Sequence, residues 1–221
     1  DAYIPFSISS DGKEIISDSI LMLEDGTYFL GKSFGSKQTK IGEICFNTSL
    51  TGYQEIMTDP SYAGQIISFT FPHIGNVGTN NFDNEGEIKS IAGIVVRQPP
   101  TNPSNWRSDQ KFYDWLKLND IPGISGIDTR MLTKIIRKYK SFNAIMSYNE
   151  FGEFNFDELK NKLKNHPKMD GLNLSSSVTT QKSYNYEESP HKLILSTPTI
   201  IDKFKPKIVV IDFGVKMNIL R

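Results

Sequence analysis

The sequence has little cysteine, little histidine and no excess of charge. Cys45 is the one cysteine in 221 residues, which excludes an internal disulfide framework and favours a reducing compartment, the cytoplasm. Lysine plus arginine and aspartate plus glutamate each number 25, so nothing electrostatic predicts binding to nucleic acid or to a membrane surface. No apolar run approaches the roughly 18 residues of a membrane span, and residues 1–20 lack a signal-peptide pattern.

Residues of the kinds that carry nucleophilic or metal chemistry are also few. The histidines are His73, His166 and His191, and none has the spacing to cysteine or carboxylate that predicts a metal site. Cys45 stands between Ile44 and Phe46 in a strand pattern without flanking glycines, which favours a buried small hydrophobe over a nucleophile. A hydrolase built from Cys45 and His73 is therefore the weakest interpretation, and we assign no catalytic residue and no metal ligand.

The apolar pattern predicts an α+β fold. Hydrophobic residues make up 38% of the chain and charged residues 23%, enough for a sizeable core. Asp25-Gly26 between apolar runs predicts a hairpin, because both turn positions tolerate positive φ. Ser108 and Asp128 are predicted to begin helices that end near Leu118 and Tyr139. Further strands are predicted over 40–46, 65–71, 90–97 and 142–146, with a weaker helix over 156–164.

A dense polar stretch lies between two apolar strands, at 44–46 and 65–71. It reads Asn47-Thr48-Ser49-Leu50-Thr51-Gly52-Tyr53-Gln54-Glu55 and ends at Asp59-Pro60. Loops on a rigid scaffold commonly carry recognition, so these donors and acceptors predict a surface for a partner. The alternative is a large turn held by its own serine, threonine and asparagine hydrogen bonds, and the pattern alone leaves the two open.

The end of the chain predicts the start of another domain. Residues 174–207 shift to serine, threonine, tyrosine, lysine and proline, which is typical of an interdomain segment with one short strand at 193–195. An apolar strand is predicted over 207–211, followed by Asp212-Phe213-Gly214 and a helical pattern to Arg221. Strand, turn and helix begin an α/β domain, so we expect the chain to stop just inside its second domain.

Several motifs together resemble one known family. They are E-I-C-F-N-T-S-L-T-G-Y-Q-E from residue 43, F-P-H-I-G-N-V-G from residue 71, I-D-T-R-M-L-T from residue 127 and V-V-I-D-F-G-V-K-M-N-I-L-R from residue 209. The chain resembles the N-terminal domain of the small, glutamine-hydrolysing subunit of carbamoyl phosphate synthetase. The resemblance implies a three-layer β/β/α domain of the swivelling type over 1–150, a connecting region over 151–206, and the start of an α/β class I glutamine amidotransferase domain over 207–221.

The resemblance also implies a function for the complete subunit. Such a subunit hydrolyses glutamine and passes ammonia to a large subunit that makes carbamoyl phosphate for arginine and pyrimidine synthesis. The implied partners are that large subunit and glutamine, with ATP and metal on the large subunit and no cofactor in this chain. The family's cysteine triad falls beyond Arg221, so this chain is expected to lack the glutaminase triad. A non-catalytic scaffold that binds the synthetase subunit is the alternative.

Two residues carry site hypotheses from the resemblance. Ser49 matches a family serine that helps to bind glutamine across the domain boundary, whereas the residues alone favour a serine that stabilises its turn. Lys216 is expected at the same interdomain cleft, although a solvated lysine is the ordinary expectation. A basic helix end, made of Lys134, Arg137, Lys138 and Lys140, is usually solvated but suits an acidic partner patch.

Overall fold

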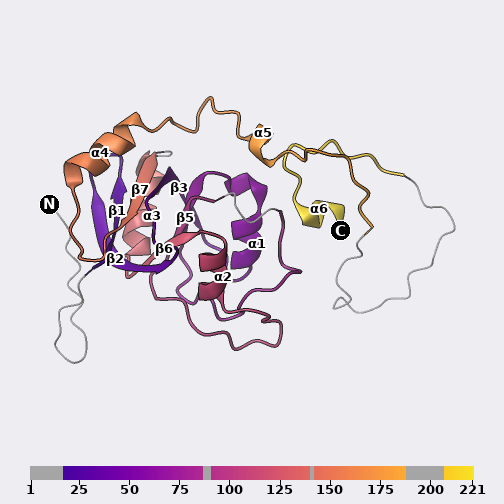
Figure 1. Ribbon diagram of the computed structural model, residues 1–221, viewed down its shortest axis with the longest axis horizontal. Coiled ribbons are helices and arrows are strands. Elements are labelled where there is room, and N and C mark those ends of the chain that lie inside the picture. Colours follow the sequence, from indigo (N-terminus) through magenta and orange to yellow (C-terminus); the bar gives the residue numbers. More distant parts are fainter. Residues whose placement is uncertain (1–16, 87–90, 140–141, 188–206) are drawn as a thin grey trace.

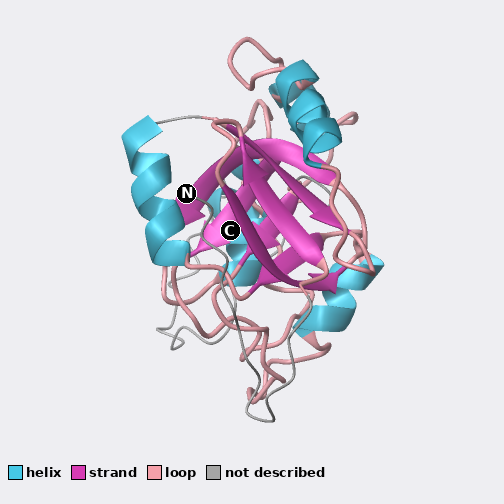
Figure 2. Cartoon of the chain, turned by 90° about the vertical axis from the view of Figure 1, so that its left-hand side faces the viewer, coloured by secondary structure: helices cyan, strands magenta, loops and turns pink. Residues whose placement is uncertain are grey.

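Seven strands close into a mixed barrel in the computed structural model, which describes residues 17–86, 91–139, 142–187 and 207–221 (Figures 1 and 2). Around the barrel the order is β1-β2-β6-β5-β4-β3-β7, and β7 pairs with β1 to complete the circle. Neighbours from β3 to β6 run parallel and the other pairs run antiparallel. The strands are β1 Ser19–Leu23, β2 Tyr28–Gly35, β3 Lys40–Asn47, β4 Gln65–Phe69, β5 Gly93–Val95, β6 Pro122–Ser125 and β7 Asn143–Tyr148.

Helices surround this barrel in the described part of the chain (Figure 2). They are α1 Tyr53–Thr58, the 3₁₀ turn η1 Pro60–Tyr62, α2 Phe112–Leu118, α3 Thr129–Tyr139, α4 Phe156–Asn165, α5 Ser175–Val178 and α6 Met217–Leu220. None of the described helices is long and apolar enough to cross a membrane. In Figure 1, α6 and the C-terminus lie on the side of the barrel that carries α1.

Alternation along the strands divides the core into three clusters. Leu21 and Leu23 of β1 point into a barrel interior that α3 also contacts, while Ile20 and Met22 point outward to α4. A third cluster lies where α1 and α2 cover the outer face of β4 and β5. Both faces of these strands are therefore buried, which explains why β1 is apolar at every position but its first.

Most locally encoded elements are confirmed. The hairpin between β1 and β2 turns at Gly26, whose φ is +85°, and Asp25 accepts a hydrogen bond from the Thr27 amide at 2.9 Å. Asp128 caps α3 by accepting from the Met131 amide at 2.9 Å. Predicted strands at 40–46, 65–71 and 142–146 correspond to β3, β4 and β7, and the weaker helix is α4. The α+β class is also confirmed.

Other predictions differ from the structure. Ser108 caps nothing: α2 begins four residues later, and the Ser108 hydroxyl donates to the Gln110 carbonyl at 3.2 Å. Residues 207–211 form no strand, because none of the described strands pairs with them; Val209 is 89% exposed. The mixed barrel with its few helices is consistent with the α+β N-terminal domain that the resemblance implies. The strand predicted at 193–195 lies outside the described residues.

Candidate functional site

Ser49 lies in the exposed loop that follows β3. Its backbone amide donates to Asn47 Oδ1 at 2.8 Å, and Asn47 Nδ2 donates to the Tyr62 hydroxyl at 3.0 Å. Among the described residues, the Ser49 hydroxyl has no hydrogen-bond partner. The turn is therefore held by the Asn47 side chain, which leaves the Ser49 hydroxyl available to a ligand.

Lys216 contacts the same region of the molecule from the C-terminal segment. Its Nζ lies 3.2 Å from Asp59 Oδ2, at the residue that caps η1. Burial would raise the pKa of Asp59, but hydrogen bonds from Ser61 and from Lys216 outweigh it and hold that pKa below its usual value. Burial would lower the pKa of Lys216, but Asp59 holds it above its usual value, with help from Glu85 and Tyr62. Lys216 is thus an ion-paired residue and not a freely solvated one.

Glu85 attaches α6 to the barrel domain. Its backbone carbonyl accepts from the Met217 amide at 2.9 Å, and its Oε2 accepts from the Asn218 amide at 2.7 Å. Glu85 is fully buried, and its own amide donates to Thr58 Oγ1 at 2.8 Å. Its Oε1 has no partner among the described residues. The Glu85 carboxylate and backbone carbonyl therefore satisfy two free amides at the N-terminus of α6, and the Glu85 backbone amide connects the same residue to the end of α1.

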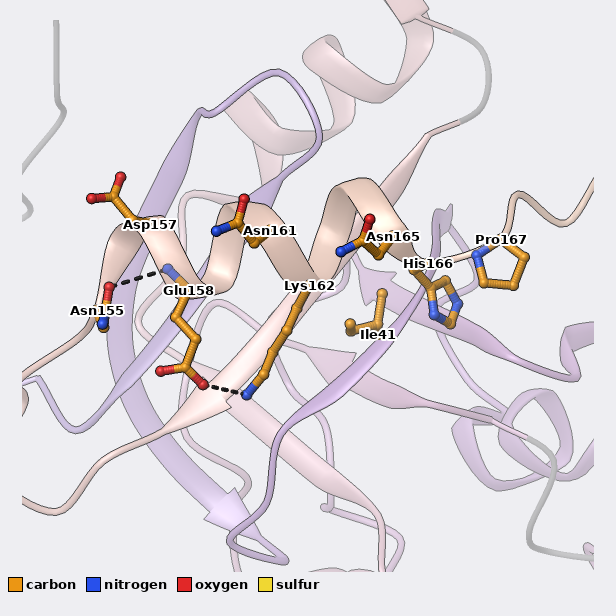
Figure 3. A pocket seen from close by; sticks show the side chains of 9 residues that line it. All are labelled: Ile41, Asn155, Asp157, Glu158, Asn161, Lys162, Asn165, His166 and Pro167. Carbon is orange, nitrogen blue, oxygen red and sulfur yellow. Dashed lines mark hydrogen bonds and ion pairs between the residues drawn. The ribbon is translucent and has the colours of Figure 1, made fainter.

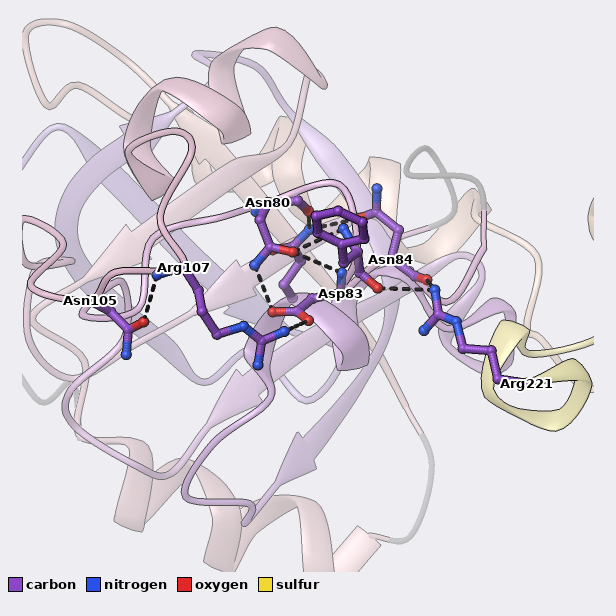
Figure 4. A network of polar contacts seen from close by, with 8 residues as sticks. Asn80, Asp83, Asn84, Asn105, Arg107 and Arg221 are labelled. Carbon is purple, nitrogen blue, oxygen red and sulfur yellow. Dashed lines mark hydrogen bonds and ion pairs between the residues drawn. The ribbon is translucent and has the colours of Figure 1, made fainter. Parts of the chain in front are cut away.

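A polar network fixes residues 80–84, the part of the loop that precedes Glu85 (Figure 4). Asp83 accepts from Asn80 Nδ2 at 2.7 Å and pairs with Arg107, which reaches in from a separate loop. Arg221 donates to the Phe82 carbonyl at 3.0 Å, so the end of the chain contacts the same loop. Residues 80–86 thus form a rigid platform between α1 and the C-terminal segment.

The Tyr-Gln pair of the polar stretch serves this platform. Tyr53 donates to the Gly78 carbonyl at 2.6 Å, and Gln54 both donates to the Asn80 carbonyl and accepts from the Asn80 amide at 3.0 Å. Both side chains are buried, and burial raises the pKa of Tyr53. These two residues therefore hold the loop in place, whereas Ser49 of the same stretch faces outward.

The structure thus brings Ser49 and Lys216 to one junction without a direct contact between them. Ser49 bonds to Asn47, which bonds to Tyr62 of η1, and Lys216 bonds to Asp59, which caps η1. Sequence reasoning missed Glu85, which lies in none of the predicted elements or motifs. No sequence signal pointed to it, because the amides that it binds, those of Met217 and Asn218, are more than 130 residues away.

Cys45 and His73 are not a catalytic pair. Cys45 sits inside β3, where burial and then the nearby Glu43 carboxylate raise its pKa to about 12. His73 is exposed and makes an edge contact with the Phe71 ring, with the ring centroids 5.6 Å apart. The described residues contain no group of three metal-ligating side chains.

A cavity of about 660 Å³ lies along α4, away from the junction (Figure 3). Part of its polar lining is already partnered: Lys162 pairs with Glu158 at 2.6 Å, and Asn155 caps the helix by accepting from the Glu158 amide at 3.1 Å. His166 sits at the far end of the helix, beside Pro167. Nothing in this lining converges on a reacting group, so we place no site there.

A family model and the curated relatives of this chain agree on one family. The family model for the carbamoyl-phosphate synthase small chain, CPSase domain, matches residues 21–146. The carbamoyl phosphate synthase small chain of Zymomonas mobilis subsp. mobilis is 43% identical over 201 residues, which are 91% of this chain and 54% of that protein. The small chain of Buchnera aphidicola subsp. Schizaphis graminum is 45% identical over 205 residues, or 92% and 53% of the two chains.

The chain spans about half the length of the curated relatives it matches. Among solved structures, an aminopeptidase from Aneurinibacillus sp. strain AM-1 aligns with a TM-score of 0.35 and 12% identity, covering 60% of this chain and 31% of that chain. That likeness is too weak to carry an argument.

Proposed function

Because this chain belongs to the carbamoyl-phosphate synthase small-chain family, we propose that it is the N-terminal part of a subunit that releases ammonia from glutamine. The ammonia would pass to a large subunit that makes carbamoyl phosphate, in a cytoplasmic heterodimer serving arginine and pyrimidine synthesis. ATP and metal would be held by the large subunit, and this chain would need no cofactor. Residues 1–150 would be the family's N-terminal domain, 151–206 a connection and 207–221 the start of the amidotransferase domain.

The junction between the barrel and the C-terminal segment carries this proposal. Ser49 presents an unpartnered hydroxyl on one side, and Lys216 approaches the same region on the other through its ion pair with Asp59. A hydroxyl both donates and accepts, which suits the ammonium, carboxylate and amide groups of glutamine. Ser49 would bind glutamine across the boundary, and Lys216 would line the interdomain cleft.

The role of this chain within that subunit would be binding and positioning. Cys45 lies within a strand, with a pKa raised to about 12, and that environment suits a packing residue better than a nucleophile. The non-catalytic scaffold role therefore still applies to these 221 residues. They would bind the synthetase subunit and form part of the wall of the glutamine cleft.

Substituting Ser49 by alanine in the complete small subunit tests the proposal. Loss of one neutral hydrogen bond to glutamine, about 0.5–1.5 kcal/mol, should raise the KM for glutamine roughly 2- to 12-fold. Carbamoyl phosphate synthesis from added ammonia should stay unchanged, because that route bypasses glutamine. Ser104→Ala, at another exposed serine, is the matched control. An unchanged KM in Ser49→Ala would remove Ser49 from the site, and a complete subunit without glutaminase activity would overturn the function.

A further inference from the structure

A second cavity, of about 620 Å³, lies where three parallel strands end. Thr48 follows β3, Thr70 follows β4 and Arg97 follows β5, and all three line this cavity. One flank of α3 forms its opposite wall with Arg130, Lys134 and Arg137, together with Thr129 and Thr133. We call this cavity the basic groove. Parallel strand ends facing a helix flank make a ready place for a ligand.

The charge in the basic groove is of one sign. Arg97, Arg130, Lys134 and Arg137 are exposed, and no Asp or Glu lines the groove. None of these four cations forms an ion pair within the described residues. The chain as a whole carries no net charge, so this local excess distinguishes one face of the molecule. Such a patch raises the encounter rate with an oppositely charged partner and orients it.

The form of the groove points to an acidic protein segment and not to a small anion. Arg130 and Arg137 are seven residues apart on one helix, which separates their backbones by roughly 10 Å. Carboxylates on alternate residues of an extended segment lie on one face at intervals of about 7 Å, so such a segment can place a separate carboxylate at each of these cations. Leu50, two residues after Thr48, is 68% exposed and adds the apolar contact that protein interfaces use.

We propose that the basic groove docks an acidic, extended segment of a protein partner, with carboxylates placed to meet Arg97 and the cations of α3. Under the proposed function that partner is the synthase large chain, and this identification rests on the proposed function. The excess of positive charge in the basic groove does not depend on that identification. The groove would then be the part of the barrel domain that recruits the partner, and it lies next to the loop that carries Ser49.

The test compares two charge reversals of equal size. Arg130→Glu with Lys134→Glu alters the groove, and Lys160→Glu with Lys164→Glu places the same change at the same spacing on exposed positions of α4. Association with the purified large chain is followed by biolayer interferometry at 50 mM and 500 mM NaCl. In parallel, the anisotropy of a fluorescein-labelled (Glu-Gly)₅ peptide measures binding by the 221-residue chain, with inorganic phosphate as competitor. Circular dichroism confirms that every variant is folded.

At low salt the groove variant should associate with the large chain at least tenfold more slowly, and the α4 variant should stay within twofold of the unaltered chain. High salt should remove most of the difference. Equal effects of the two variants, or none, would overturn the proposal. So would displacement of the peptide by phosphate in a saturable one-to-one manner, which would mark a small-anion site.

Failure of the proposed function gives a different result. If the unaltered chain does not associate with the large chain at either salt concentration, that partner is wrong and the peptide measurement decides. If only the groove variant loses binding to the peptide, the groove still docks an acidic segment. If all variants bind the peptide equally, the groove does not bind acidic segments and the proposal is wrong.

Discussion

Replacing Glu85 by alanine should release α6 from the barrel without unfolding the barrel. The change removes the acceptor of the Asn218 amide, a bond of 2.7 Å to a fully buried carboxylate. A hydrogen bond to a charged group contributes about 1.5–3 kcal/mol, so opening of α6 should become roughly 10- to 150-fold more favourable. Glu85→Gln keeps an oxygen acceptor without the charge and should show a smaller effect, because charge-assisted bonds are about twice as strong.

Hydrogen exchange resolved by residue is the appropriate assay. The Asn218 amide should exchange faster by that factor, while amides of β7, in the barrel, should keep their protection because local opening leaves the core intact. Glu55→Ala is the matched control, since Glu55 is an acidic neighbour on α1 with no described bond to residues 207–221. Unchanged exchange at Asn218 in Glu85→Ala would refute the reasoning. Equal acceleration in β7 would show instead that Glu85 stabilises the whole domain.

Three further outcomes are expected. Leu21→Ala, in the barrel interior, should lower the free energy of unfolding by about 2–5 kcal/mol in urea, whereas a loss under 1 kcal/mol would mean that the interior is loosely packed. Cys45 should resist iodoacetamide at pH 8 in the folded chain and react in urea, because burial raises its pKa to about 12; rapid reaction in the folded state would contradict that burial. The carboxyl carbon of Asp59 should titrate by NMR below the ordinary 3.8. The contribution of Asp59 to stability is then present above pH 3.8 and lost as the pH falls through the lowered pKa. Lys216→Met should move the titration midpoint of Asp59 upward, and an unmoved midpoint would argue that the ion pair is absent in solution.

Local chemistry made the hairpin and the helix caps predictable from the sequence. Gly26 supplies positive φ within four residues of two apolar runs, and Asp128 sits three residues before the amide that it caps. Barrel closure was not predictable, because it depends on β1 pairing with β7 more than 120 residues later. The apolar run at 207–211 has the composition of a strand, but composition does not reveal that no described strand pairs with it.

The site residues also differ in whether the sequence alone could predict them. Lys134 and Arg137 were recognisable as a basic helix end, whereas Arg97 joins them only because parallel pairing brings the end of β5 beside α3. Lys138 and Lys140 belonged to the same prediction, but Lys138 does not line the groove and Lys140 lies outside the described residues. Ser49 came from a family motif, and Glu85 had no motif because its role depends on a helix more than 130 residues away.

Closure of the barrel decides how other molecules can bind to it. An open sheet presents unpaired amides and carbonyls at its edges, and these recruit further strands, including those of unwanted copies. Each strand from β1 to β7 instead has a neighbour on both sides, so within the described residues the sheet has no free edge. Strand addition to the barrel, whether by a partner peptide or in amyloid-like assembly, is thereby disfavoured. Recognition must use side chains and loops, and the strand pairing of the barrel can stay unchanged whatever domain follows the connecting segment.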